Sequence, residues 1–235
     1  MGDAASAPRE EIMVRFQDRR EAGRRLAAAL RHEVGPNVLV LGLARGGVPV
    51  AYEVARRLRA PLDVLVVRKL GVPEQKELAM GAIAPGGARV INEEVVRPLQ
   101  IPRQTIDAVT AAEQQEIERQ EGAYRDGRPR EEVRGRHVVV VDDGLATGAT
   151  MRAAIASLRA SGARRITVAV PAGSPESCDD LRRDADEVLC LHAPEWLFAV
   201  GQFYEDFSQT TDDEVRGLLS RAAREHLEAH HGAHR

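Results

Sequence analysis

Five short apolar runs constrain the fold of this chain more than any other feature of its sequence. They read NVLVLGL from position 37, LDVLVV from 62, HVVVV from 137, ITVAV from 166 and EVLCL from 187. Continuous apolar runs of this length are typical of strands that are covered on both faces. The first run is followed by Val48, Ala51, Tyr52 and Ala55 at helical spacing. We therefore predict an α/β fold with a mostly parallel, open sheet and helices on both faces.

A different composition separates the second run from the third. Residues 92–132 are polar and rich in Glu, Gln and Arg, with a narrow apolar stripe of Ile106, Val109 and Ile117. We interpret this segment as a helical insertion that flanks the sheet or pairs with another subunit. The length of the chain suits one domain over residues 1–235, with this insertion inside it.

Composition and charge exclude several classes of partner. A formal net charge of -3 gives no electrostatic footprint for nucleic acid or an anionic membrane. No run of 18 apolar residues occurs, and the N-terminus has no basic stretch followed by an apolar core. Cys178 and Cys190 are too few for a disulfide framework and are expected to be reduced thiols. These features favour a cytoplasmic protein without a nucleic-acid or membrane partner.

The third apolar run leads into the most informative stretch, VVVVDDGLATGAT at residues 138–150. Open parallel sheets bind ligands at the carboxyl ends of their strands, where loops lead into helix N-termini. Gly144 and Gly148 allow a tight turn whose N–H groups converge on an anion. A helix that starts near Thr147 adds the positive end of its dipole, and Thr147 and Thr150 add hydroxyl groups. The stretch predicts a phosphate cradle, although it lacks the lysine of a P-loop.

Asp142 and Asp143, at the end of the same run, suit a ligand that is rich in hydroxyls. Two carboxylates would repel a phosphate placed directly on them, whereas they accept hydrogen bonds from sugar hydroxyls or approach a bridging metal ion. A phosphate cradle beside two such acceptors describes a site for ribose 5-phosphate. The plainer alternative is a strand with an acidic end followed by an ordinary helix cap.

This stretch resembles the signature of the type I phosphoribosyltransferases, which bind 5-phosphoribosyl 1-pyrophosphate. In that family a hydrophobic strand precedes two acidic residues, two mostly apolar residues, a variable position and Thr-Gly-x-Thr, and residues 138–150 match each step. The resemblance implies catalytic roles for Asp142 and Asp143, with Mg²⁺ as cofactor and held by them only indirectly, through ribose hydroxyls or water. It also implies that the loop binds the substrate through Gly144, Leu145, Ala146, Thr147, Gly148, Ala149 and Thr150.

The resemblance extends to two earlier loops. LARGG at residues 43–47 falls where the family has its pyrophosphate loop, which implies substrate contacts for Arg45, Gly46 and Gly47. VRKLGVPEQKELAMGA at residues 67–82 falls where the family has a mobile loop that closes over the reacting centre. Arg68 and Lys69 would supply positive charge for catalysis there, and a solvated strand end is the alternative.

The chemistry implied by the resemblance is displacement of pyrophosphate from ribose C1 by a nitrogenous base. Mg²⁺ would bridge pyrophosphate and ribose hydroxyls, and loop closure would exclude water. A non-catalytic regulator that senses phosphoribosyl pyrophosphate or a nucleotide could use the same site, as could other chemistry on a phosphorylated ribose. The partners expected are therefore phosphoribosyl pyrophosphate, a small aromatic acceptor and a second copy of the chain in a homo-oligomer such as a dimer.

Two features bear on the acceptor. Ala146 stands where family members that act on 6-oxopurines resemble one another in carrying aspartate, and the pattern RK-x-G-x-P at residues 68–73 is similar to that of adenine enzymes. Five of the eight aromatic residues lie in a segment at 192–211, which is expected to form a hood over the acceptor. Trp196, Phe203 and Tyr204 would stack on a flat ring there. A small satellite core is the alternative for these rings.

Overall fold

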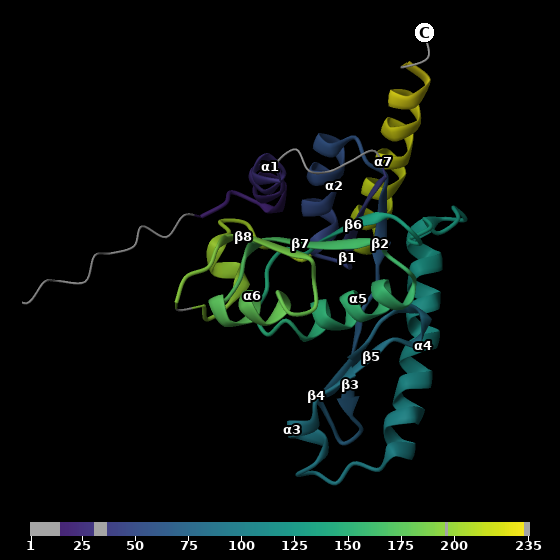
Figure 1. Cartoon of the computed structure of the whole chain (residues 1–235), viewed down its shortest axis with the longest axis vertical. Coiled ribbons are helices and arrows are strands. Elements are labelled where there is room, and N and C mark those ends of the chain that lie inside the picture. The colour runs from purple at the N-terminus through teal and green to yellow at the C-terminus, as the bar shows by residue number, and fades with distance from the viewer. Residues whose placement is uncertain (1–14, 31–36, 196, 233–235) are drawn as a thin grey trace, which may run out of the picture.

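A five-stranded parallel sheet forms the centre of the computed structural model, which describes residues 15–30, 37–195 and 197–232 (Figure 1). The strand order is β2-β1-β6-β7-β8, and every neighbouring pair in it is parallel. The strands are β1 (Val38–Leu43), β2 (Leu62–Leu65), β6 (His137–Val141), β7 (Arg165–Ala172) and β8 (Glu187–His192). The five apolar runs thus form the five parallel strands, which confirms the predicted fold class.

Helices cover both faces of this sheet (Figure 1). Helices α1 (Arg19–Ala29), α2 (Gly47–Leu58) and α7 (Asp212–Gly232) lie on one side, and α5 (Ala149–Ala160) and α6 (Pro175–Leu181) lie on the other. Val139 and Val141 pack into the core on the α2 side of the sheet, whereas Val138 and Val140 pack into the core on the α5 side. Burial of each such side chain contributes about 1.5–3 kcal/mol, which explains why the strands lack polar alternation. Among the described residues, no helix has the length and apolar character needed to cross a membrane.

A second, antiparallel sheet projects from the first together with a long helix (Figure 1). It consists of β3 (Arg68–Val72), β4 (Gln75–Ile83) and β5 (Arg89–Ile91), with the short 3-10 helix η1 (Pro85–Gly87) between the last two. Residues 92–132 contain the short α3 (Glu93–Val96) and the long α4 (Arg103–Arg125), which lies beside this sheet. We call the three strands, α3 and α4 the arm.

The segment at residues 67–82, expected to be a mobile loop, forms the β3–β4 hairpin instead. The prediction was wrong about its local structure because the segment contains enough apolar residues to pack. Leu70, Met80 and Ile83 are fully buried and belong to the core on the α2 side of the main sheet. Gly81 permits the pairing of β4 with β5, because a β-carbon there would lie 2.4 Å from the carbonyl oxygen of Val90.

A buried cluster of charges anchors one end of α4 to the edge strand β2. The Nε of Arg125 donates to both carboxylate oxygens of Asp63 at 3.0 Å, and its Nη1 donates to Glu121 at 3.0 Å. Its Nη2 donates to the carbonyl oxygen of Val64 at 3.1 Å. All three charged side chains are less than 10% exposed. The cluster fixes the base of the arm against the sheet.

Replacing Arg125 by Met should lower the free energy of unfolding by about 3–5 kcal/mol, because it removes the cationic partner of the buried carboxylate of Asp63. Arg119→Met on the same helix is the control, since this side chain is 66% exposed in its ion pair with Glu116. Arg119→Met should lower the free energy of unfolding by less than about 1 kcal/mol. Urea denaturation measures both changes, and equal losses would contradict the anchoring role of the cluster.

Candidate functional site

The loops that follow β1 and β6 lie against each other at the carboxyl edge of the sheet. The two strands are paired, with Gly42 opposite Val141 at their ends. A β-carbon on Gly46 would lie 2.1 Å from an oxygen of Asp143, and one on Gly47 would lie 2.6 Å from the carbonyl oxygen of Val141. Only glycine allows so close an approach. The structure therefore brings together the predicted pyrophosphate loop and the acidic pair.

The loop at residues 144–150 offers a row of free donors. In the described part of the chain, no acceptor takes the backbone N–H groups of the five residues 146–150. Gly148 has a φ of 70° and caps the N-terminus of α5, so the row continues into the first turn of the helix. Ala146 and Thr147 are exposed. Free N–H groups and a helix dipole together form a ready site for a phosphate.

Neighbouring segments hold this loop in place from behind. The N–H of Leu145 donates to the carbonyl oxygen of Ala172 at 2.8 Å, and the N–H of Ser174 donates to that of Leu145 at 3.2 Å. The hydroxyl of Ser177 in α6 donates to the carbonyl oxygen of Ala146 at 2.7 Å. The last two of these bonds occupy loop carbonyls, and none of the three uses an N–H group of residues 146–150. The neighbouring strand and helix thus fix the shape of the cradle.

Asp142 and Asp143 occupy different electrostatic environments although they are adjacent. Enclosure by the protein and the neighbouring charge of Asp143 raise the pKa of Asp142 well above its ordinary value. The N–H of Asp143 donates to Oδ1 of Asp142 at 2.8 Å. Asp143 instead forms an ion pair with Arg19, whose Nε lies 2.8 Å from its Oδ2. Asp142 therefore retains a proton more readily than a solvated aspartate, and Asp143 has a cationic partner.

Arg19 is a site residue that the sequence did not reveal. It is the first residue of α1, directly after Asp18, which caps the helix by accepting from the N–H of Glu21. A cation at a helix N-terminus opposes the helix dipole, so its position is unfavourable for the helix itself. An arginine directly after a capping aspartate was the signal that could have marked it.

The side chains of Arg45, Arg68 and Lys69 lie in three different surroundings. Arg45 is partly exposed, and its Nη1 lies 3.6 Å from Asp212 at the start of α7. Arg68 forms an ion pair with Glu113 of α4. The side chain of Lys69 is exposed and has no hydrogen-bond or ion-pair partner among the described residues. None of the three side chains forms a hydrogen bond or an ion pair with the acidic pair in the described part of the chain.

The aromatic segment is mainly a satellite core. Phe203 and Tyr204 are 2% and 4% exposed and pack with Phe16, which corrects the expectation that these two rings form an exposed stacking wall. The N–H of Phe16 donates to the carbonyl oxygen of Phe203 at 2.7 Å, so this core joins the start of the described chain to the segment. Trp196 lies outside the described residues. Phe207 is 37% exposed and stacks on Tyr204 with ring centroids 4.9 Å apart.

The residues of the site do not fit a metal ion held directly by the chain. Among the described residues, no group of three or more His, Cys, Asp or Glu side chains is placed to hold one. One carboxyl of the acidic pair has a raised pKa, and an oxygen of the other is bound to Arg19. The geometry leaves open only the indirect role that the sequence predicted for Asp142 and Asp143.

Comparison with known proteins establishes the family. The model of the phosphoribosyl transferase domain matches residues 74–208, more than half of the chain, and this span includes the acidic pair and the cradle. The chain belongs to the phosphoribosyl transferase family. This confirms the resemblance of residues 138–150, and the matched span contains strands β6, β7 and β8 of the parallel sheet.

Three relatives illustrate the similarity. The Mycobacterium tuberculosis proteins Rv0571c and MT0597, which carry provisional phosphoribosyl transferase names, are each 52% identical over 214 residues. The alignment covers 91% of this chain and 48% of theirs, so the chain spans about half the length of these relatives. The crystal structure of TT1426 from Thermus thermophilus is 43% identical, with a TM-score of 0.76 over 88% of this chain and 98% of that one.

Replacing Asp142 by Asn should raise thermal stability, and the gain should increase with pH. The folded protein raises the pKa of Asp142, so ionisation of this carboxyl costs stability as the pH rises through the folded-state value. An amide cannot ionise and removes that cost. Melting temperatures at about pH 5 and about pH 8 should show the larger gain at the higher pH.

Asp206→Asn is the matched control for this measurement. The N–H of Ser208 lowers the pKa of Asp206, so this carboxyl is ionised at both pH values. Its substitution should change stability by the same amount at each pH. A gain for Asp142→Asn that did not depend on pH would contradict the raised pKa.

Proposed function

We propose that the chain is a phosphoribosyltransferase that uses 5-phosphoribosyl 1-pyrophosphate. It would transfer ribose 5-phosphate to a nitrogenous base and release pyrophosphate, as in nucleobase salvage. The row of free N–H groups at residues 146–150 beside Asp142 and Asp143 carries this proposal. A phosphate and the hydroxyls of its sugar require these two groups of partners at neighbouring positions.

Each part of the site has a role in this proposal. The cradle binds the 5-phosphate, and the acidic pair accepts hydrogen bonds from the ribose hydroxyls. The loop at 44–47 lies against the acidic pair and is therefore near the far side of the ribose, where the pyrophosphate would extend. Lys69, whose side chain is exposed and without a partner in the described chain, is the cation proposed to supply positive charge to the leaving group.

Mg²⁺ belongs to this proposal only as an ion carried by the pyrophosphate. The chain offers carboxylates near the ribose hydroxyls, but it supplies no ligand set of its own among the described residues. Catalysis by the chain then consists of positioning the sugar and excluding water.

The acceptor proposed is a flat nitrogenous base other than a 6-oxopurine. Ala146 offers no carboxylate to a purine ring, and it is exposed at the mouth of the cradle. The partly exposed ring of Phe207 replaces Phe203 and Tyr204 as the aromatic surface on which such a base would stack.

Release of pyrophosphate across a panel of bases tests the function. The protein is incubated with phosphoribosyl pyrophosphate and MgCl₂ together with adenine, hypoxanthine, guanine, uracil or orotate in turn. The expected result is pyrophosphate release that depends on one base other than hypoxanthine or guanine. Calorimetric binding of phosphoribosyl pyrophosphate without base-dependent turnover would favour a sensor instead. No binding at all would overturn the proposal.

Replacing Thr150 by Asp should abolish binding of ribose 5-phosphate while preserving or raising stability. A carboxylate in the first turn of α5 interacts favourably with the helix dipole, by about 0.3–1 kcal/mol, yet it repels a phosphate at the same position. Thr150→Asn introduces a side chain that is nearly isosteric with aspartate but uncharged, so this variant should still bind ribose 5-phosphate. Calorimetry and thermal unfolding measure the two effects, and undiminished binding by Thr150→Asp would place the phosphate elsewhere.

A further inference from the structure

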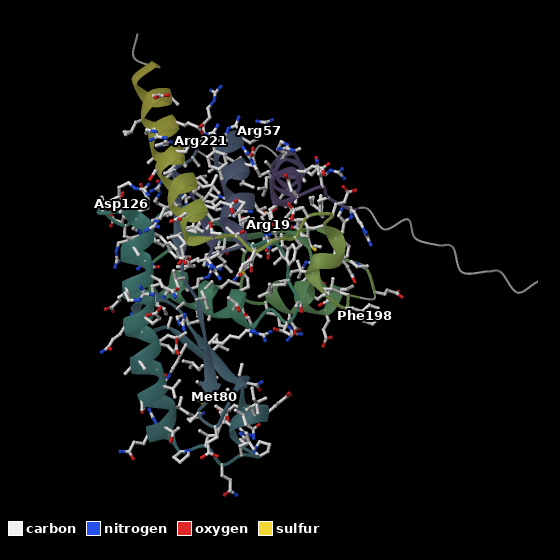
Figure 2. The ribbon with its side chains drawn as sticks, turned by 180° about the vertical axis from the view of Figure 1, so that it is seen from behind. Arg19, Arg57, Met80, Asp126, Phe198 and Arg221 are labelled. Carbon is white, nitrogen blue, oxygen red and sulfur yellow. The ribbon has the colours of Figure 1, made fainter. Side chains whose placement is uncertain are left out.

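Arg19 joins three parts of the chain at the site. Its Nε donates to Oδ2 of Asp143 at 2.8 Å, and its Nη1 donates to the carbonyl oxygen of Ser208 at 2.6 Å. Its guanidinium carbon lies 4.0 Å from the ring centroid of Phe207. Figure 2 labels Arg19 near the middle of the molecule, away from the projecting arm that carries Met80. Helix α1, the loop after β6 and the segment at 192–211 therefore meet at this one side chain.

Several contacts hold the guanidinium of Arg19 in one position. The side chain is 12% exposed, and its partner Asp143 is 16% exposed, so the pair is largely removed from water. The Ser208 carbonyl and the Phe207 ring hold the planar group on two further sides. Backbone bonds hold the base of the side chain, since the N–H groups of Glu205 and Asp206 donate to the carbonyl oxygens of Phe16 and Gln17.

Neighbouring groups also hold Asp143, the partner of Arg19, in place. The hydroxyl of Tyr204 donates to its carbonyl oxygen at 2.6 Å, and Gly46 leaves no free space on one side of its carboxylate. Arg19 occupies one acceptor position of Oδ2, so Oδ1 keeps more capacity to accept from a sugar hydroxyl. The ion pair thus holds the rotamer of Asp143 and favours Oδ1 as the oxygen that meets a ligand.

The ion pair also changes the charge that an anionic ligand meets. A sugar phosphate in the cradle would lie next to two carboxyl groups. A carboxylate without a neighbouring cation would repel the negative charge of the phosphate. Arg19 provides an adjacent positive charge at low exposure, where solvent screens it little. Arg20, the next residue of the helix, pairs with Glu53 of α2 instead and does not contribute to the site.

We propose that Arg19 is a positioning residue for the ribose: it orients Asp143 toward one sugar hydroxyl and offsets the charge of that carboxylate. The inference rests on the proposed function, because it assumes that the cradle and the acidic pair bind a sugar phosphate. It goes further in assigning a role in recognition to the helix that precedes β1. A purely structural role would require Arg19 only to attach α1 to the rest of the chain.

Binding of two probes by Arg19→Met separates these roles. Ribose 5-phosphate should bind about tenfold or more weakly than to the unsubstituted protein, because a charged hydrogen bond that orients Asp143 is lost. Inorganic phosphate offers Asp143 no sugar hydroxyl and loses only the charge compensation, so its affinity should fall by about threefold or less. Arg19→Lys keeps the charge and should recover part of the affinity for ribose 5-phosphate, and it serves as the test if Arg19→Met does not fold.

Arg20→Met is the matched control, since it breaks an ion pair of α1 that lies outside the site. It should leave the affinity for both probes unchanged. In Asp143→Asn the further change Arg19→Met should cost little affinity for ribose 5-phosphate, because the two residues act as one unit. Unchanged binding of ribose 5-phosphate by Arg19→Met would overturn the inference alone. Failure of the unsubstituted protein to bind either probe would instead overturn the proposed function and the inference with it.

Discussion

The pairing of β1 with β6 is the interaction on which the rest of the structure depends. Because these two strands are parallel neighbours, their carboxyl ends lie at one edge of the sheet, and the loops that follow them meet there. Gly46 and Gly47 allow the contact to be close enough for backbone to touch the acidic pair. The valines of β6, which are buried on both faces, hold the strand in this register. The chemistry of the site thus follows from the packing of the sheet.

Two adjacent aspartates acquire different properties from the groups around them. Enclosure and a like charge raise the pKa of Asp142, whereas Arg19 compensates the charge of Asp143. A ligand therefore meets one carboxyl that is readily protonated and one that is paired. This arrangement suits hydrogen bonding to neutral hydroxyls better than direct binding of a divalent ion. In the proposed function the phosphate lies apart from this pair, on backbone N–H groups that carry no full charge.

The sequence predicted those features that depend on local pattern. Continuous valines predicted strands buried on both faces, and the order of residue types at 138–150 predicted a cradle beside two acids. It did not predict the hairpin at 67–83, because the apolar residues that fix it find their partners in the main core. It also missed Arg19, which reaches Asp143 across 124 positions of the chain. Phe203 and Tyr204 are buried because they pack with Phe16, and no local sequence pattern specifies the position of Phe16.

The site draws on parts of the chain that lie outside the span matched by the family model. The matched span begins at residue 74. It therefore leaves out helix α1, the edge strand β2, its neighbour β1 and the Arg45–Gly47 loop. A fragment trimmed to residues 74–208 would keep the cradle and the acidic pair, yet it would leave β6 without its neighbour and Asp143 without its counter-ion. Such a fragment would expose one whole margin of the sheet to self-association. The family match therefore covers fewer residues than those that build the candidate site.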